Sequence, residues 1–298
     1  MKKQLKGSLL LLLATVIWGS AFVAQSVGMD HIGPFTFQAA RCGYGVAGLI
    51  PIIFLMDLGK QDGKTFVSRW KEPQLWKAGL FCGIALFVAT GTQQMGMVYT
   101  DPGKAGFITA MYIVIVPVIG FFLGQKAGWK IWVSVAMAVA GLYLLSAVGV
   151  SQVNIGDIYI MACAVAFAVQ IVLVDRMGKR LDGLRLNFVQ FLVNGILSAL
   201  FMFLTEQPKL DSILACTGPL LYTGILSSGI AYSLQIIGQQ NISPDRASLI
   251  MSLESVFAVL SGWLVLNQRL TGPEALGCCL VFAGVILSQL PEKIKAPS

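Results

Sequence analysis

"ASLIMSLESVFAVLSGWLVL" (247–266) is a stretch of twenty residues, nearly all apolar, with a single charged residue, Glu254. At about 1.5 Å rise per residue, an α-helix of this length spans about 30 Å, the thickness of the hydrocarbon core of a bilayer. A carboxylate about 10 Å from the nearer water costs about 2.5–3.5 kcal/mol there. The stretch therefore predicts a transmembrane helix, and the acid within it needs an explanation.

The composition of the whole chain is that of a membrane protein. Of its 298 residues, 56% are hydrophobic and 12% are charged, whereas soluble domains contain about 25% charged residues. The net charge is +7, but the basic residues lie between hydrophobic runs instead of forming a patch. We therefore expect a lipid bilayer, and not a nucleic acid, as the partner of this chain.

Ten hydrophobic runs follow one another along the chain, each near the length of a spanning helix. They cover about 7–27, 34–56, 76–99, 103–124, 129–148, 156–174, 186–204, 213–237, 247–266 and 272–290. The first run follows a basic N-terminus as in a secretory signal, but we expect it to stay uncleaved as the first helix. The sequence thus predicts an all-α integral membrane protein with ten transmembrane helices.

Lysine and arginine set the expected orientation. With both termini inside, 17 of the 21 basic residues fall in cytoplasmic stretches and three, Lys104, Lys209 and Arg269, fall in outer loops. The remaining one, Arg41, lies within a span. This asymmetry predicts that both ends of the chain are cytoplasmic.

Two stretches of the chain are similar to each other. "DPGKAGFITAMYIVIVPVIGFFLGQK" (101–126) aligns with "SPDRASLIMSLESVFAVLSGWLVLNQR" (243–269), and Tyr112 then aligns with Glu254. The identical or similar pairs are Gln93/Gln235, Gly96/Gly238, Pro102/Pro244, Lys104/Arg246, Ala105/Ala247, Ile108/Ile250 and Gly120/Gly262. We therefore expect two five-helix repeats, 1–150 and 151–298. An odd number of spans per repeat inverts the second one and places a central cavity between the two.

Several motifs resemble a known family. "ATVIWGSAFV" (14–23), "GPF…AAR" (33–41) and "SLESVFAVLSGWLVLNQRLT" (252–271) are similar to the EamA-like members of the drug/metabolite transporter (DMT) superfamily, and the similarity covers essentially the whole chain. The resemblance implies a ten-helix transporter of the bacterial cytoplasmic membrane that moves small metabolites such as amino acids, usually outward. The family commonly has Gly-Glu after helices 4 and 9, where this chain has Gly124-Gln125 and Asn267-Gln268. No role of that glutamate is therefore carried over.

Polar and aromatic side chains inside the runs are the candidate site, because an unpartnered polar group in lipid is costly. On the first helix, Thr15, Trp18, Phe22 and Gln25 share one face. The residues expected to line the cavity are Trp18, Gln38, Arg41, Gln93, Tyr112, Gln190, Tyr232, Gln235 and Glu254. The alternative for each is a bond between helices, worth about 0.6 kcal/mol.

Depth along each run suggests two polar layers. Arg41, Gln93 and Tyr112 are expected near the outer surface, and Gln190, Gln235 and Glu254 near the inner surface, with Trp18 between the layers.

The sequence is compatible with two roles for Glu254 and with two roles for Arg41. Desolvation favours the neutral carboxyl, so Glu254 could bind a proton on one side and release it on the other. Its alternative role is to fasten its helix. Arg41 could bind a carboxylate of the substrate or serve as a fixed structural cation. A direct salt bridge between the two residues stays open as well.

These residues favour a secondary transporter of small metabolites that works by alternating access, and the family resemblance implies that it is an exporter. No P-loop occurs in the sequence, and the six cysteines and one histidine lack metal-ligand spacing, so we expect no ATP hydrolysis, no cofactor and no metal. The alternatives are an intramembrane enzyme, which would need a constellation of paired acids, metal ligands or a nucleophile with a base, and a receptor or scaffold without transport. A homodimer is an open alternative to a monomer.

Overall fold

A computed structural model describes residues 2–58, 65–100, 102–125, 127–146, 154–266 and 271–290. Within these residues the secondary structure is helical, without a strand, which confirms the all-α class. Several expectations fall outside the described residues: the 150/151 boundary between the repeats, Asn267-Gln268, the C-terminal 291–298, and Lys60, Lys64, Lys126 and Arg269 of the orientation count.

Eight helical segments among the described residues are long and apolar enough to cross a bilayer. They are Lys2–Met29 (α1), Pro34–Leu58 (α2), Pro73–Met97 (α3), Lys104–Phe122 (α4, Pro102–Thr109, with α5, Tyr112–Phe122), Ile155–Gly178 (α7), Gly183–Thr205 (α8), Thr217–Gln239 (α10, Thr217–Leu221; η2, Tyr222–Ala231; α11, Tyr232–Gln239) and Gly272–Gln289 (α14). A shorter apolar stretch, Trp129–Leu145, lies in α6 (Trp129–Ser146). The chain also forms α12 (Pro244–Met251) and α13 (Leu253–Leu266), with two short helices, η1 (Ser68–Trp70) and α9 (Leu210–Ala215).

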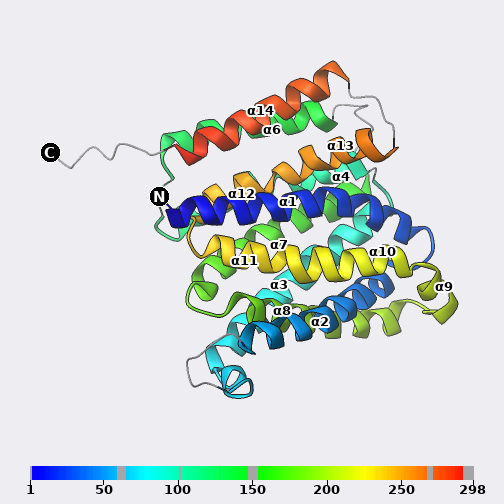
Figure 1. The fold of residues 1–298 in the computed structure, drawn as a ribbon. Helices are drawn as coiled ribbons and strands as arrows, with labels where there is room; N and C mark the ends of the chain where they lie inside the picture. Colours follow the sequence, from blue (N-terminus) through cyan, green and yellow to red (C-terminus); the bar gives the residue numbers. More distant parts are fainter. Residues whose placement is uncertain are drawn as a thin grey trace.

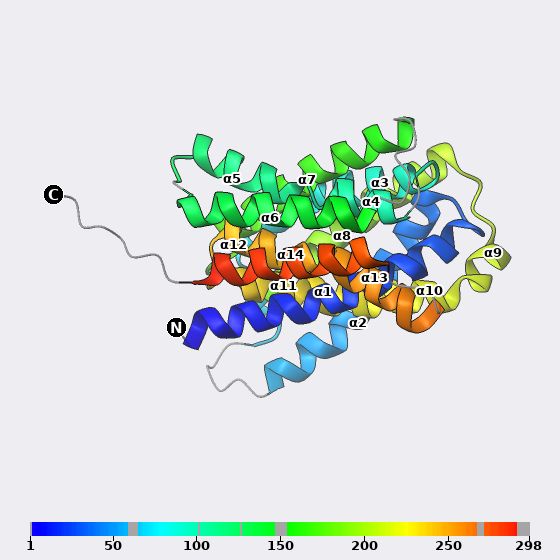
Figure 2. The same ribbon diagram turned by 90° about the horizontal axis from the view of Figure 1, so that it is seen from above.

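Most of the helices run side by side along one direction (Figures 1 and 2), and in the view of Figure 1 α1, α7 and α11 lie between the two edges of the bundle. The α6–α14 pair forms one edge of the bundle, and α2 and α8 form the opposite edge (Figure 1). Large apolar side chains such as Phe122, Phe203 and Leu204 are exposed on the outside. An exterior of this kind fits contact with lipid.

Local sequence explains where several helices begin. Asn154 and Asp157 form a capping box at the start of α7, and Thr271 and Glu274 form another at the start of α14. In each box two side chains satisfy backbone N–H groups that have no partner within the helix. A proline stands in the first turn of α3, α12 and α14, where its missing N–H costs nothing.

Three segments depart from a continuous α-helix. The α4–α5 segment is interrupted at Ala110 and Met111, and the α12–α13 segment is interrupted at Ser252. Tyr112 directly follows the first interruption, and Glu254 lies two residues after the second. The third departure is the π-helical η2, a wide-turn geometry that often occurs at functional sites. All three departures therefore lie next to predicted site residues.

Glycines allow several helices to pack closely. A methyl group on Gly141 of α6 would lie 2.6 Å from the carbonyl oxygen of Gly277 of α14. On Gly96 of α3 it would lie 2.9 Å from the carbonyl oxygen of Gly156 of α7, and on Gly238 of α11 it would lie 3.0 Å from that of Gly7 of α1. Small residues at such crossings are the usual means of close helix association in membranes.

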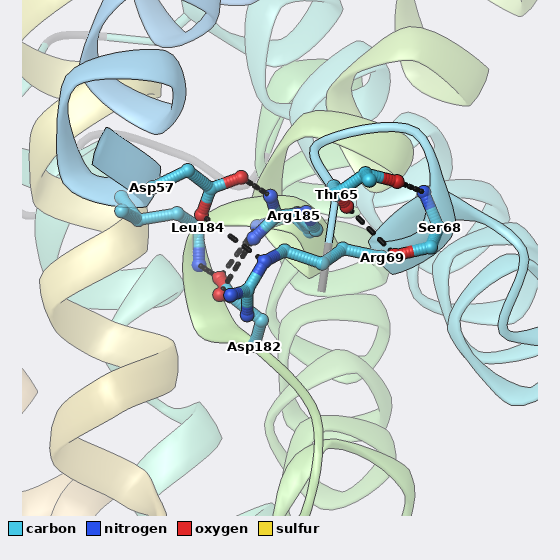
Figure 3. A network of polar contacts seen from close by, with 7 residues as sticks. All are labelled: Asp57, Thr65, Ser68, Arg69, Asp182, Leu184 and Arg185. Carbon is cyan, nitrogen blue, oxygen red and sulfur yellow. Dashed lines mark hydrogen bonds and ion pairs between the residues drawn. The ribbon is translucent and has the colours of Figure 1, made fainter. Parts of the chain in front are cut away.

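The antiparallel helices α2 and α8 hold each other at both ends. At one end, Glu206 after α8 accepts hydrogen bonds from the backbone N–H groups of Phe35 and Thr36 at 2.8 and 2.9 Å, and from the Thr36 hydroxyl at 2.5 Å. At the other end, Asp57 of α2 forms an ion pair with Arg185 in the first turn of α8 (Figure 3). Each helix therefore begins where the other ends.

The buried Arg185 is the centre of a cluster of half-buried side chains (Figure 3). Its side chain is 2% exposed, and its second carboxylate partner is Asp182, at 2.8 Å. The guanidinium carbon lies 5.3 Å from the ring centre of Trp70 and 5.9 Å from that of Phe66, distances typical of cation–π contacts. The cluster therefore joins the α2–α3 connection to the ends of both helices.

The start of α1 and the end of α14 lie at the same end of the bundle (Figures 1 and 2). The Ser8 hydroxyl of α1 donates to the side-chain oxygen of Gln289 of α14 at 3.3 Å. This arrangement is what an even number of membrane crossings requires.

The Arg185 cluster gives a direct test of this packing. Replacing Arg185 with Ala removes the buried cation that pairs with Asp57 and Asp182, while Arg69 stays 3.7 Å from Asp57. We expect the free energy of unfolding to fall by about 3 kcal/mol. Reversible unfolding by SDS in mixed micelles measures the change. The exposed Arg180 in the connection between α7 and α8 provides the control, because Arg180→Ala should change stability by less than about 0.5 kcal/mol. Equal effects of the two substitutions would contradict the role assigned to Arg185.

Candidate functional site

A cavity of about 50 Å³ lies within the bundle, among α1, α2, α3, α5, α7, η2, α11, α12 and α13. Its lining consists of Trp18, Phe22, Gln25, Arg41, Gln93, Tyr112, Phe167, Ile171, Ser227, Tyr232, Gln235, Met251 and Glu254. A single water needs roughly 10–15 Å³ by this kind of measure, so the cavity has room for a few waters or a small part of a ligand. Polar side chains from segments far apart in the sequence, such as Arg41 and Glu254, meet at this cavity.

Seven of the nine residues predicted from the sequence line this cavity: Trp18, Arg41, Gln93, Tyr112, Tyr232, Gln235 and Glu254. The other two, Gln38 and Gln190, are buried but are not part of the lining. Gln38 donates a hydrogen bond to the Thr90 hydroxyl at 2.7 Å and joins α2 to α3. Gln190 donates to Asn187 one turn before it in α8. Gln190 also accepts from Gln170 of α7 at 3.3 Å, so both glutamines form the bonds between helices that the alternative role predicts.

Arg41 is held by neutral oxygen atoms from two other segments. Its Nε donates to the Ser228 hydroxyl at 3.1 Å, and its Nη1 donates to the side-chain oxygen of Gln25 at 3.0 Å. A longer contact of 3.5 Å reaches the Ser227 hydroxyl. These bonds fix the guanidinium plane beside the cavity. Because the three oxygen atoms are neutral, they do not neutralise the positive charge of Arg41.

Glu254 is 8% exposed, and its carboxylate accepts a hydrogen bond from the Tyr112 hydroxyl at 3.2 Å. The sequence left open a salt bridge between Glu254 and Arg41. In the structure both side chains line the cavity, but Arg41 bonds to Gln25, Ser227 and Ser228, whereas Glu254 bonds to Tyr112. The cavity therefore contains an acid and a cation that bind separate partners.

Tyr112 and Glu254, which are expected in different polar layers, share a hydrogen bond, so their side chains meet at the cavity. Depth was counted along continuous straight helices. The chain is interrupted just before each of these residues, at Ala110–Met111 and at Ser252, so this counting does not apply to them. The length of the tyrosine side chain closes the remaining gap.

Aromatic rings and two polar atoms complete the lining. The ring centres of Trp18 and Tyr232 lie 4.8 Å apart in an edge-to-face arrangement, and the ring centre of Phe191 lies 5.1 Å from that of Tyr232. Within the described part of the chain, the Trp18 Nε1 donor and the Gln235 Oε1 acceptor are buried without a hydrogen-bond partner. Such groups are costly unless a ligand or water satisfies them.

Some lining residues were found by the sequence reasoning and others were missed. Phe22 and Gln25 share the predicted face of the first helix with Trp18. Residues not predicted are Phe167, Ile171, Ser227 and Met251. Three of these residues are apolar, and residues of the same types also face the lipid, so the sequence alone does not distinguish them. Gln170, whose amide donates to Gln190 at 3.3 Å, was also missed, although a lone glutamine in an apolar run was a usable signal.

The described residues contain no group of three or more His, Cys, Asp or Glu side chains that could hold a metal ion. The arrangement at the cavity instead suits recognition of a small molecule, with a cation, an acid, amides and aromatic rings around one space.

Comparison with known proteins places the chain in a family. The model of the EamA-like transporter family matches residues 5–147 and 154–290. A protein named "Uncharacterized transporter" from Archaeoglobus fulgidus is 32% identical over 97% of this chain and 87% of its own length. "Uncharacterized transporter YoaV" from Bacillus subtilis is 24% identical over 92% of this chain and 93% of its own length.

A solved crystal structure has the same fold, with a TM-score of 0.77 at 20% identity over 95% of this chain and 96% of the other chain. The more distant "WAT1-related protein At3g02690, chloroplastic" of Arabidopsis thaliana is 23% identical over 92% of this chain and 67% of its own length. The family match covers nearly the whole chain, and the relatives named here as transporters match along most of their own length. The chain therefore belongs to the EamA-like transporter family and is a multi-pass membrane protein.

Proposed function

We propose that this protein is a secondary transporter that exports small zwitterionic metabolites, such as amino acids, across the bacterial cytoplasmic membrane by alternating access. The observation that carries the proposal is the cavity that Arg41 and Glu254 both line. A carboxylate of the substrate would bind beside the fixed guanidinium, and an amino group would lie toward the acid. The proposal includes no catalytic step.

The proposed fold has ten membrane-spanning helices in two halves, 1–150 and 151–298, of which the second is inverted. Close glycine contacts support it. Gly96 of α3 packs against Gly156 of α7, and Gly238 of α11, which aligns with Gly96, packs against Gly7 of α1. The α3–α7 contact and the α11–α1 contact are then equivalent. A two-fold rotation that places one half on the other converts the first contact into the second.

The contacts between α2 and α8 support the same relation. Asp57 at the end of α2 binds Arg185 at the start of α8, and Glu206 after α8 binds Thr36 at the start of α2. Thr36 and Arg185 have the same separation in sequence as Asp57 and Glu206, so one alignment of the halves relates both contacts. The two stretches matched by the family model, 5–147 and 154–290, also fall on either side of the proposed boundary.

The cavity lies where such a transporter needs its substrate site. Tyr112 and Glu254 are aligned residues of the two halves, and they form a hydrogen bond with each other. Aligned residues can meet only close to the axis that relates the halves. Transporters built from inverted repeats bind substrate near the membrane midplane between the repeats, and the movement of one repeat against the other opens the site to each side in turn.

Glu254 is the proposed carrier of the coupling proton. Its carboxylate is buried in the cavity lining and is stabilised by the neutral donor Tyr112. A proton taken up by Glu254 from outside would be released inside, in exchange for substrate that moves outward. With both termini cytoplasmic, as proposed from the basic residues, outward substrate flow is then driven by the inward proton gradient.

Substitution of Glu254 by Gln tests this coupling. The amide has the shape of the protonated acid and still accepts from Tyr112, but it cannot release a proton. We expect proteoliposomes with Glu254→Gln to lose uptake of radiolabelled amino acids driven by a pH gradient, while exchange of internal for external substrate continues. Glu72→Gln, at an exposed position before α3, is the control and should match the wild type. Gradient-driven uptake at the wild-type rate in Glu254→Gln would rule out the proposed role.

Substitution of Arg41 tests the carboxylate site. A hydrogen bond to a charged group contributes about 1.5–3 kcal/mol, so Arg41→Gln should weaken amino-acid binding roughly tenfold to a hundredfold. Arg41→Lys keeps the charge without the planar fork and should bind with intermediate affinity. Because Arg41 also joins three segments, binding is measured on protein whose folding has been checked by its unfolding midpoint. Wild-type affinity in folded Arg41→Gln would contradict the assignment.

A further inference from the structure

A chain of four amide side chains runs from the π-helical segment to the cavity. It consists of Asn187 and Gln190 on α8, Gln170 on α7 and Gln235 on α11. All four residues are buried, with at most 2% of their surface exposed. An amide presents an N–H donor on one side and an oxygen acceptor on the other, so the orientation of one member constrains the next.

The first member of the chain has a fixed orientation. The Asn187 Nδ2 lies 2.9 Å from the backbone carbonyl oxygens of Ser228 and Gly229 and 2.9 Å from the Ser233 hydroxyl. Backbone carbonyls only accept hydrogen bonds, and the Ser233 hydroxyl donates its own proton to the Gly229 carbonyl at 2.6 Å. The group of Asn187 that faces them is therefore its NH₂, and the Asn187 oxygen points the other way.

This orientation is passed along the chain. The Asn187 oxygen accepts from the NH₂ of Gln190 at 2.8 Å, and the Gln190 oxygen accepts from Gln170 at 3.3 Å. The Gln170 oxygen in turn accepts from the NH₂ of Gln235 at 3.1 Å. Reversing any member would place two oxygens or two NH₂ groups of buried side chains against each other.

Gln235 is the last member and lines the cavity. Its NH₂ donates to Gln170, so its oxygen is the group available to the cavity. That oxygen has no hydrogen-bond partner among the described residues. An acceptor buried in this way favours a ligand that brings a donor. The Glu254 carboxylate and the Tyr232 ring line the same space and also favour a positively charged donor.

We propose that Gln235 is a fixed hydrogen-bond acceptor that selects substrates carrying a protonated amino group, and that Gln170, Gln190 and Asn187 are positioning residues that hold it in this orientation. The inference rests on the proposed function, because it assigns the substrate class of the same cavity. It differs from a simple lining role because three residues outside the cavity then control which chemical group the cavity accepts.

The readout is selectivity rather than affinity. The twenty common L-amino acids serve as probes, each compared with the carboxylic acid that lacks its amino group, and competition binding to purified protein gives the ratio of the two affinities. We expect the wild type to prefer the amino acid. Gln170→Leu frees the amide of Gln235 to turn its NH₂ toward the cavity, and we expect the ratio to fall by at least about tenfold, as for a lost hydrogen bond to a charged group.

Two variants separate orientation from stability. Gln170→Glu in its protonated form keeps a donor and an acceptor in the same places, and in its ionised form it still accepts from Gln235, so the wild-type ratio should be retained. Gln239→Leu removes a buried glutamine one turn along α11 that donates to the Ile171 carbonyl and does not line the cavity. It should lower stability without changing the ratio. If Gln170→Leu does not fold, Gln190→Met breaks the chain one step further away and is expected to lower the ratio in the same way.

The outcomes distinguish this inference from the proposed function. An unchanged ratio in folded Gln170→Leu or Gln190→Met, with a wild type that prefers amino acids, would overturn the inference and leave the transporter proposal standing. Wild-type protein that binds none of the amino acids would overturn the proposed substrate class and the inference with it. Loss of selectivity in Gln239→Leu to the same extent would show that the effect is one of general stability and would also overturn the inference.

Discussion

The absence of water from the hydrocarbon core is the constraint on which the rest of this structure depends, because polar groups there must find partners within the protein. The bundle meets it by collecting polar side chains at the ends of α2 and α8 and around one cavity. Arg185 binds two carboxylates at one end, and Glu206 binds the start of α2 at the other. In the cavity, Arg41 and Glu254 have neutral partners, so their charges are available to a ligand.

Departures from regular helix lie next to the same side chains. The interruption at Ala110–Met111 ends directly before Tyr112, and the one at Ser252 lies two residues before Glu254. The π-helical η2 supplies the carbonyls that orient Asn187. Irregular backbone at membrane depth is tolerated where it is buried in protein or lines a cavity. The irregular segments therefore have a structural reason, since each positions a polar group that the hydrogen-bond networks of the interior use.

The helical class and most of the cavity could be predicted because their signals are local. Hydrophobic runs predict helices, and a polar residue such as Arg41 or Glu254 inside a run is conspicuous. The hydrogen-bond partners could not be predicted, because they depend on helix tilt and on interruptions that bring Tyr112 to Glu254. Gln38 and Gln190 resemble lining residues in the sequence, yet each bonds to another buried side chain beside the cavity. Apolar lining residues such as Phe167 and Ile171 carry no signal that separates them from residues that face lipid.

The central claim is that two antiparallel halves enclose the cavity, and its most direct test is the sidedness of two equivalent loops. His31 follows α1 and Arg180 follows α7; both are exposed and occupy corresponding positions in the proposed halves. Single cysteines at these positions, in a cysteine-free background, would be labelled with a membrane-impermeant maleimide in intact cells and in inverted vesicles. The account predicts that position 31 reacts in cells and position 180 in inverted vesicles. Reaction of both positions from the same side would contradict it.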